Sequence, residues 1–143
     1  MSESTGYSFS YNPLTSKQLI EVLKLAKAKI FRKKNWTQRA YAKDATGKSL
    51  DMGLLTNYFN GINPDLKPVC YCSLGAVCMA ALEYHAKNPS ITYRNIYYDT
   101  RAALSLNTYE MRTGQSIAIF NDNRDHASVI KMFNEAIKNL SEA

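Results

Sequence analysis

Residues 69–86, VCYCSLGAVCMAALEYHA, are the most apolar run of the chain and contain one acidic residue and no proline. On a helical wheel most of these side chains are apolar, and Glu83 and Lys87 mark only a narrow polar strip. A helix that is apolar over most of its circumference is usually buried. The run therefore predicts a buried central helix over residues 72–87, against which the other elements pack.

Three further segments have the apolar spacing of helices that pack on such a core. The first is predicted from residue 15 or 16 to residue 33 or 34, and Thr15 and Gln18 have the spacing of a capping box. Another is predicted over residues 93–106, and the last and clearest over residues 126–140. The sequence therefore predicts three to four helices around the central helix.

Residues 36–50 contain strand and turn formers and predict a small β-hairpin or an extended segment. Within them, residues 44–48 have the composition of a turn and include Gly47. Residues 54–68 predict a long loop with a short helical turn inside it, and the apolar run at 117–120 is too short to assign. The expected fold class is mainly α (α+β).

The chain has 143 residues, 45% of them hydrophobic, which is the size of one ordinary domain. We expect a flexible tail over residues 1–14, which are Ser-rich and aperiodic, and a single globular domain over residues 15–143. The sequence has neither a secretory signal pattern nor a membrane-spanning run. It therefore predicts a cytoplasmic protein without a membrane partner, and it leaves oligomerisation open.

The net charge of +6 is unevenly distributed. Residues 17–48 hold ten Lys and Arg residues against Glu21 and Asp44, a balance of +8 that leaves −2 for the rest of the chain. Such asymmetry is typical of proteins with an anionic partner, whether a nucleotide, a nucleic acid or an acidic protein surface. The alternative is that the lysines form the solvated face of the first helix.

Five residues within the basic region interleave aromatic rings, an amide and cations: Trp36, Gln38, Arg39, Tyr41 and Lys43. Aromatic faces stack on bases, and Arg and Lys hold phosphate, so this mixture indicates a nucleotide or a single-stranded nucleic acid. In an extended segment Arg39, Tyr41 and Lys43 would share one face. The alternative is that the aromatic residues belong to the core and the charges face water.

Cys70 and Cys72 fall at the predicted start of the central helix, where the helix dipole lowers a thiol pKa. Asn121, Asp122 and His126 follow downstream and are the histidine and the amide or carboxylate types that cysteine hydrolases combine with a thiol. A cysteine-dependent hydrolase or transferase is therefore one alternative function. Structural burial of the thiols is the commoner explanation of such cysteines.

The same cysteines could form a zinc site with His85 and His126, but neither histidine is followed by a second ligand three or four residues later. His85 fits better as a core histidine that is hydrogen-bonded to a carbonyl. The common phosphate-loop and hydrolase motifs are absent from the sequence. We therefore predict no catalytic residue, no metal and no cofactor, and we favour a protein that is not an enzyme.

Four motifs occur in a fixed order: WTQRAYA followed by D and TGK, then VCYCSLGA, then SIAIFND, and finally HASVIKMFNEAI. In this order they resemble a family of small bacterial and phage proteins of unknown function, over roughly Leu19 to Leu140. The resemblance implies a common fold and a site built from these motifs, and it implies no reaction.

Together these observations favour a non-catalytic protein that captures a small anionic, nucleotide-like ligand, in the manner of a phage anti-defence sponge. An interaction module that binds nucleic acid or an acidic host protein through the first helix is the other alternative. If phage-encoded, the protein would act in the cytoplasm of the bacterial host. The predicted ligand site comprises Trp36, Gln38, Arg39, Tyr41, Lys43, Cys72, Asn121, Asp122 and His126.

Overall fold

The computed structural model describes residues 13–109 and 116–142, and its main elements are helices. In chain order these elements are α1 (Ser16–Ile30), the 3-10 helix η1 (Lys33–Asn35), β1 (Ala42–Asp44), β2 (Ser49–Leu50), α2 (Met52–Phe59), β3 (Pro68–Tyr71), α3 (Ser73–Lys87), α4 (Tyr93–Leu106), α5 (Ile117–Asn123) and α6 (His126–Ser141). The predicted fold class, mainly α with a minor β element, is confirmed.

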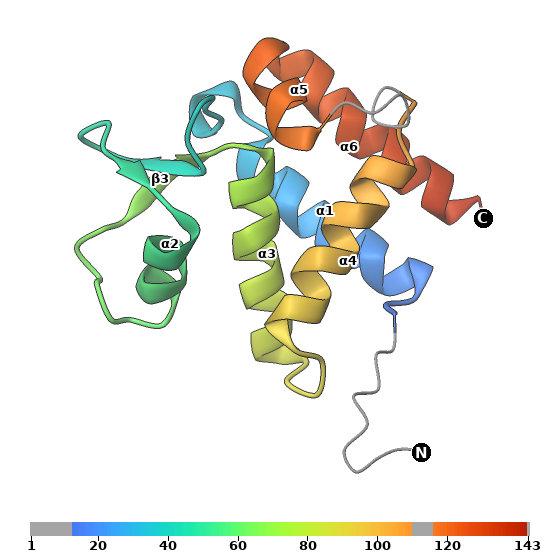
Figure 1. Cartoon of the computed structure of the whole chain (residues 1–143), viewed down its shortest axis with the longest axis horizontal. Coiled ribbons are helices and arrows are strands. Elements are labelled where there is room, and N and C mark those ends of the chain that lie inside the picture. The colour runs from blue at the N-terminus through green and yellow to red at the C-terminus, as the bar shows by residue number, and fades with distance from the viewer. Residues whose placement is uncertain (1–12, 110–115, 143) are drawn as a thin grey trace.

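Helix α3 lies at the centre of the molecule, as the apolar run predicts. Its residues from Ser73 to Leu82 are all buried. Figure 1 shows α3 between the small sheet with α2 on one side and the remaining helices on the other. The helix begins at Ser73 because residues 68–71 pair as strand β3 and Cys72 caps the helix, so the first part of the apolar run is a strand.

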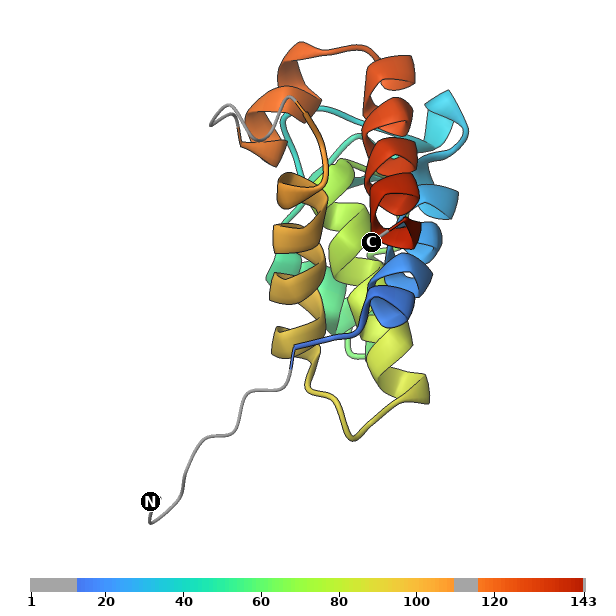
Figure 2. The same ribbon diagram turned by 90° about the vertical axis from the view of Figure 1, so that its right-hand side faces the viewer.

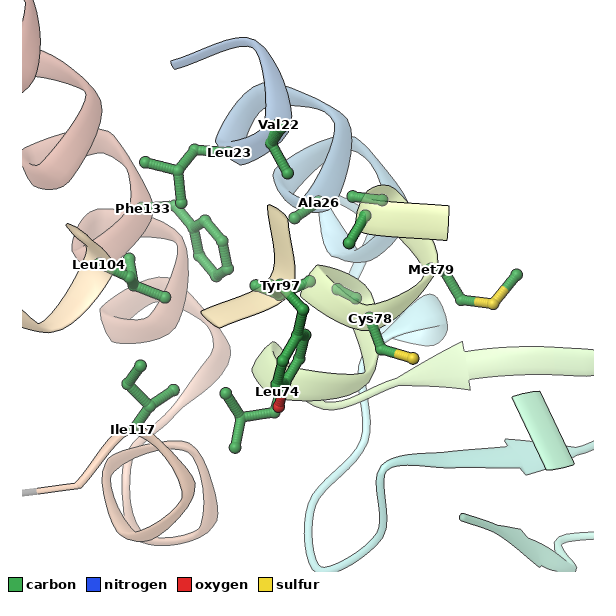
Figure 3. Close-up of a cluster of buried hydrophobic side chains, with 14 of the residues drawn as sticks. Val22, Leu23, Ala26, Leu74, Cys78, Met79, Tyr97, Leu104, Ile117 and Phe133 are labelled. Atoms are coloured by element: carbon green, nitrogen blue, oxygen red, sulfur yellow. The ribbon is translucent and has the colours of Figure 1, made fainter. Parts of the chain in front are cut away.

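The other long helices form a bundle on the far side of α3. Helix α1 contacts α3, α4 and α6, and α4 contacts both α3 and α6, an arrangement that can be followed in Figure 2. Figure 3 shows Leu23, Leu104 and Phe133, from three different helices, pointing toward one another. Phe133 and Leu104 are fully buried, so this contact region belongs to the main hydrophobic core.

The predicted hairpin is present. β1 is the middle strand of an antiparallel sheet, and Ala42 pairs with Leu50 of β2 on one side and with Tyr71 of β3 on the other. In the turn between β1 and β2 the Asp44 carboxylate accepts the N–H of Thr46 at 2.9 Å. Gly47 has φ +87°, a left-handed conformation that glycine adopts without strain.

Gly75 lies where the chain before β1 crosses the first turn of α3. A Cβ atom at this position would lie 1.9 Å from the Tyr41 carbonyl oxygen. The same carbonyl accepts the N–H of Cys72 at 3.0 Å. The absence of a side chain at Gly75 therefore lets the segment that leads into the sheet pack directly on the start of the central helix.

The boundaries of several elements differ from the sequence-based expectation. Helix α1 has the predicted capping box but ends at Ile30, before the basic turn that was expected to continue it. The first part of the loop expected over residues 54–68 belongs to helix α2, which has two turns and is capped by Asp51. The unassigned run at 117–120 is helical, because Ser116 caps it and Ile117 and Phe120 share its buried face.

Helix α4 spans the predicted residues, and the chain before α1 is also part of the domain. Leu14 is 7% exposed, and its N–H donates to Asp99 of α4 at 2.9 Å. The globular domain therefore includes Leu14, which we expected to lie in the tail, whereas residues 1–12 of that tail lie outside the described part. Within the described residues no helix is both long and apolar enough to cross a membrane.

Candidate functional site

A cleft of about 600 Å³ lies between the segment before β1, the β2–α2 corner, the start of α3 and helix α5. About half of its lining residues are apolar, and the others carry hydroxyl, thiol, amide or charged groups. The lining residues are Arg39, Ala40, Tyr41, Ser49, Leu50, Asp51, Leu54, Cys72, Leu74, Ala118, Asn121 and Asp122. Clefts of this size and mixed character are typical of small-molecule sites. Five of the nine predicted ligand residues lie in it.

Arg39 lines the cleft from a strained backbone. Its φ is +63°, and among the described residues no other non-glycine has a positive φ. This conformation costs an ordinary L-residue about 1–2 kcal/mol. The Asp122 carboxylate stabilises it by accepting the Arg39 N–H at 2.7 Å. Within the described part of the chain the Arg39 guanidinium forms no ion pair, so its donors are open to a ligand.

The charges around Arg39 are mixed. Two carboxylates, Asp51 and Asp122, line the same cleft. Asp51 accepts the N–H of Leu54 at 2.8 Å and Asp122 accepts that of Arg39, so each is already hydrogen-bonded to the backbone. The structure therefore provides one available cation beside two stabilised anions, and most of the basic residues found in the sequence lie elsewhere.

Asn121 of α5 is the centre of a buried hydrogen-bond network below the cleft. The side chain is 1% exposed, and its Oδ1 atom accepts the Trp36 indole N–H at 2.8 Å. The same oxygen accepts the Ser73 N–H at 3.0 Å and the Ser73 hydroxyl at 2.7 Å. Its amide group donates to the Thr37 carbonyl at 3.0 Å. Asn121 thus connects α5, the start of α3 and the segment before β1.

Gln38 and Trp36, which were predicted to contact the ligand, have their polar groups engaged in this framework. The Gln38 amide nitrogen donates to three carbonyls at the end of α5, those of Asn121, Asp122 and Arg124, at 3.0–3.3 Å. Both side chains are half-buried, and neither lines the cleft. Trp36 and Gln38 therefore hold α5 in place as part of the cleft wall, and they do not themselves line the cleft.

His126 and Lys43 also lie outside the cleft lining. His126 Nε2 is 2.7 Å from the Ile30 carbonyl, and its ring packs on Trp36 with 5.5 Å between the ring centroids. Lys43 lies in β1. The expected alternation of an extended segment fails before the strand, because the left-handed backbone at Arg39 changes the chain direction and brings Ala40 into the same wall as Arg39 and Tyr41.

The thiol of Cys72 is neutral rather than activated. Cys70 lies in β3, and Cys72 is the N-cap of α3, where its sulfur accepts the Gly75 N–H at 3.4 Å. Burial raises the pKa of Cys72 to about 11, and the hydrogen bonds from the helix N-terminus offset this only in part. The expectation that the helix dipole lowers this pKa is therefore wrong, because desolvation of the thiolate is the larger effect.

The raised pKa of Cys72 predicts a loss of stability at alkaline pH. In the unfolded chain the thiol ionises near pH 8.5–9, whereas the folded protein keeps it protonated up to about pH 11. The protonated Cys72 thiol therefore makes its full contribution to the free energy of unfolding below pH 8.5, and this contribution decreases as the pH rises. We expect Cys72 alone to lower the free energy of unfolding by about 1 kcal/mol between pH 8.5 and 10.

This fall should be absent from Cys72→Ser, whose hydroxyl retains an N-cap but does not ionise in that range. Urea denaturation of both proteins at the two pH values measures the difference. Tyrosines and Cys78 contribute equally to both proteins, so an identical pH dependence would show that Cys72 is not the titrating group.

The other candidate metal ligands are separated. His85 Nδ1 is 2.6 Å from the Ile91 carbonyl, in the turn between α3 and α4, which confirms its prediction as a histidine bonded to a carbonyl. In residues 13–109 and 116–142, no three His, Cys, Asp or Glu side chains are grouped as a metal site would require.

Sequence reasoning missed the wall of the cleft that β2, α2 and the outer side of α5 supply, which includes Ser49, Asp51, Leu54 and Ala118. The pairing register of the predicted hairpin could have located part of this wall. Once residues 44–48 are read as its turn, residues 49–51 must lie opposite residues 41–43. The hairpin register thus places Asp51 near Tyr41 without further information.

We compared the chain with known proteins. Neither the curated proteins nor the solved structures contain a match. A family model described as "Family of unknown function (DUF6197)" matches residues 14–139, nearly the whole described domain. This range includes every element from α1 to α5 and most of α6, together with all residues of the cleft. The chain therefore belongs to this family of unknown function.

Proposed function

We propose that the protein is a non-catalytic binding protein that captures a small, nucleotide-like ligand in the cleft around Arg39. The observation that carries this proposal is the conformation of Arg39. A cation occupies a left-handed position that glycine would occupy at lower cost. Among the described residues its guanidinium has no ion-pair partner at the edge of the cleft. Strain retained at such a place is a common property of ligand sites.

The composition of the cleft limits the chemistry of the ligand. One available guanidinium suits a single anionic group, such as a phosphate monoester, and the two carboxylates disfavour a ligand with many negative charges. Tyr41, which is 39% exposed, offers a ring face for stacking. Leu50 and Leu54 supply apolar contacts. A nucleoside with one phosphate combines a ring, hydroxyl donors and one anion.

Capture without turnover is favoured over cysteine chemistry by the state of Cys72. A nucleophilic cysteine needs a thiolate and a nearby base. Cys72 is protonated at neutral pH, and the His126 ring nitrogen Nε2 is engaged with a backbone carbonyl. Stoichiometric capture is also the means by which such a protein would sequester a nucleotide-type defence signal in the cytoplasm of a bacterial host, the use we propose if it is phage-encoded.

The central test is a pair of substitutions at Arg39. Both Arg39→Ala and Arg39→Gly remove the guanidinium, and we expect each to weaken ligand binding by about ten- to a hundredfold. Their stabilities should differ, because glycine relieves the left-handed backbone that alanine retains. We expect Arg39→Gly to be about 1 kcal/mol more stable than Arg39→Ala.

The ligand is first identified by mass spectrometry of small molecules released by heating the purified protein, with nucleoside monophosphates and cyclic nucleotides as reference probes. Calorimetric titration then measures affinity, and urea denaturation measures stability. Lys48→Ala, which removes an exposed cation outside the cleft lining, is the matched control. Unchanged binding in both Arg39 variants would refute the proposal. A larger loss in Cys72→Ser than in Arg39→Ala would favour the cysteine enzyme.

A further inference from the structure

We infer that a second surface, at the end of α1, binds single-stranded nucleic acid. We call it the basic edge. It consists of Lys24, Lys27, Phe31, Arg32, Lys33 and Lys34. In Figure 2, α1 and the turn that follows it lie along the right-hand edge of the ribbon. None of these residues lines the cleft around Arg39, so this surface is independent of the function proposed above.

The sequence around the basic edge carries an excess of positive charge. Residues 22–43 contain eight Lys and Arg residues and no Asp or Glu. Lys29 forms an ion pair with Glu83 at 2.6 Å, but in the described part of the chain no cation of the basic edge has such a partner. Several cations held close together without counter-charges favour a polyanionic partner, whose binding releases counterions.

The helix dipole does not account for this concentration of charge. Cations in the last turn of a helix stabilise its C-terminus, and this explains Lys27 and Lys29. Arg32, Lys33 and Lys34 follow the end of the helix, where the effect falls off, and all three are exposed. A second role is therefore needed for the cations beyond Ile30.

Phe31 distinguishes the basic edge from a simple solvated surface. Its side chain is 60% exposed, and the Lys27 ammonium lies 5.6 Å from the ring centroid. An exposed aromatic ring among cations is the arrangement that binds an unpaired base by stacking while Lys and Arg contact the neighbouring phosphates. Each base of a single strand presents a face for such stacking, whereas the bases of a duplex are already stacked.

The dimensions also fit a short length of one strand. Lys24 and Phe31 are seven residues apart in a helix, which is about 10 Å. Even at the spacing of about 3.4 Å per phosphate of a fully stacked strand, that span covers no more than about three phosphate intervals, which is a short length of one strand. Docking to a membrane would require several apolar anchors, whereas the basic edge presents one large apolar side chain. A single strand is therefore the partner to which the surface is best matched.

The test compares two triple variants that lose the same charge. Arg32→Ala/Lys33→Ala/Lys34→Ala removes the cations of the basic edge, and Lys48→Ala/Lys87→Ala/Lys138→Ala removes three exposed lysines elsewhere. Filter binding measures affinity for a 15-nucleotide oligothymidine at several salt concentrations. We expect the first triple variant to lose about tenfold or more in affinity. The slope of its log affinity against log salt concentration should fall by about two units. Both changes should be much smaller in the second triple variant.

Phe31→Ala keeps every charge and tests the stacking contact. We expect it to weaken oligothymidine binding by about tenfold without changing the salt slope. Circular dichroism establishes that each variant is folded. Equal losses in the two triple variants, or unchanged binding in Phe31→Ala, would overturn the inference. So would tighter binding to a 15-base-pair duplex or to phosphatidylserine vesicles than to the single strand.

Discussion

Gly75→Ala is expected to destabilise the protein by about 3 kcal/mol or more. In most helices this substitution is favourable, because alanine has the higher helix propensity. Here the new methyl group would lie 1.9 Å from the Tyr41 carbonyl oxygen and 2.8 Å from its carbon. Both are backbone atoms, so either the start of α3 or the segment before the sheet must move, which also breaks the hydrogen bond from Cys72 to Tyr41.

Gly53→Ala is the matched control, because Gly53 also lies within a helix and its nearest neighbour would be a side-chain oxygen of Asp51 at 3.4 Å. That substitution should leave stability unchanged or raise it by up to about 1 kcal/mol. Urea denaturation followed by circular dichroism measures both variants. If Gly75→Ala were as stable as Gly53→Ala, the close approach of Tyr41 to α3 would be incorrect.

Asn121→Ala is expected to cost about 2–4 kcal/mol. It removes one side chain but leaves four groups without a partner: the Trp36 indole N–H, the N–H and hydroxyl of Ser73, and the Thr37 carbonyl. Water entering from the cleft satisfies part of this loss, so the cost remains below the sum of four separate penalties. Because the network holds α5 beside Arg39, ligand affinity should decrease as well.

The control for this substitution is Asn123→Ala in the same helix. Asn123 is exposed, and among the described residues its amide donates to the Ile119 carbonyl within α5 and to no other group. Asn123→Ala should therefore lower the free energy of unfolding by less than about 1 kcal/mol. Urea denaturation midpoints and slopes give the free energies of unfolding of Asn121→Ala and Asn123→Ala, which are then compared. A similar small cost at both positions would mean that the network around Asn121 contributes little to the fold.

The fold was largely predictable because its strongest signal is local. The length of the apolar run around α3 indicates a buried helix. The cap at Thr15 and the periodicity of the last helix can likewise be recognised from residues that lie close together in the sequence. The sequence could not show that Val69 and Cys70 belong to a strand, because three or four apolar residues have no distinct period. These residues form a strand because they pair with β1, which is a contact between segments distant in the sequence.

The candidate site was predictable in its residue types and less so in their roles. The chemistry of Arg39 and Tyr41 predicts a place in the site, and both residues line the cleft. The chemistry of Trp36, Gln38 and His126 predicts the same, but their polar groups are hydrogen-bonded to the protein itself. A polar side chain that binds a ligand and one that satisfies a buried backbone group look alike in a sequence, since both need hydrogen-bonding atoms.

The hydrogen bond between Trp36 and Asn121 also gives the protein a built-in optical reporter. Trp36 is the only tryptophan of the chain, and its indole N–H donates to a residue that lines the cleft. Tryptophan emission depends on the polarity and hydrogen bonding around the indole. We therefore expect occupation of the cleft to change the intrinsic fluorescence without an attached dye. Excitation at a wavelength that the ten tyrosines do not absorb assigns the emission to a single position at the junction of α3, α5 and the sheet.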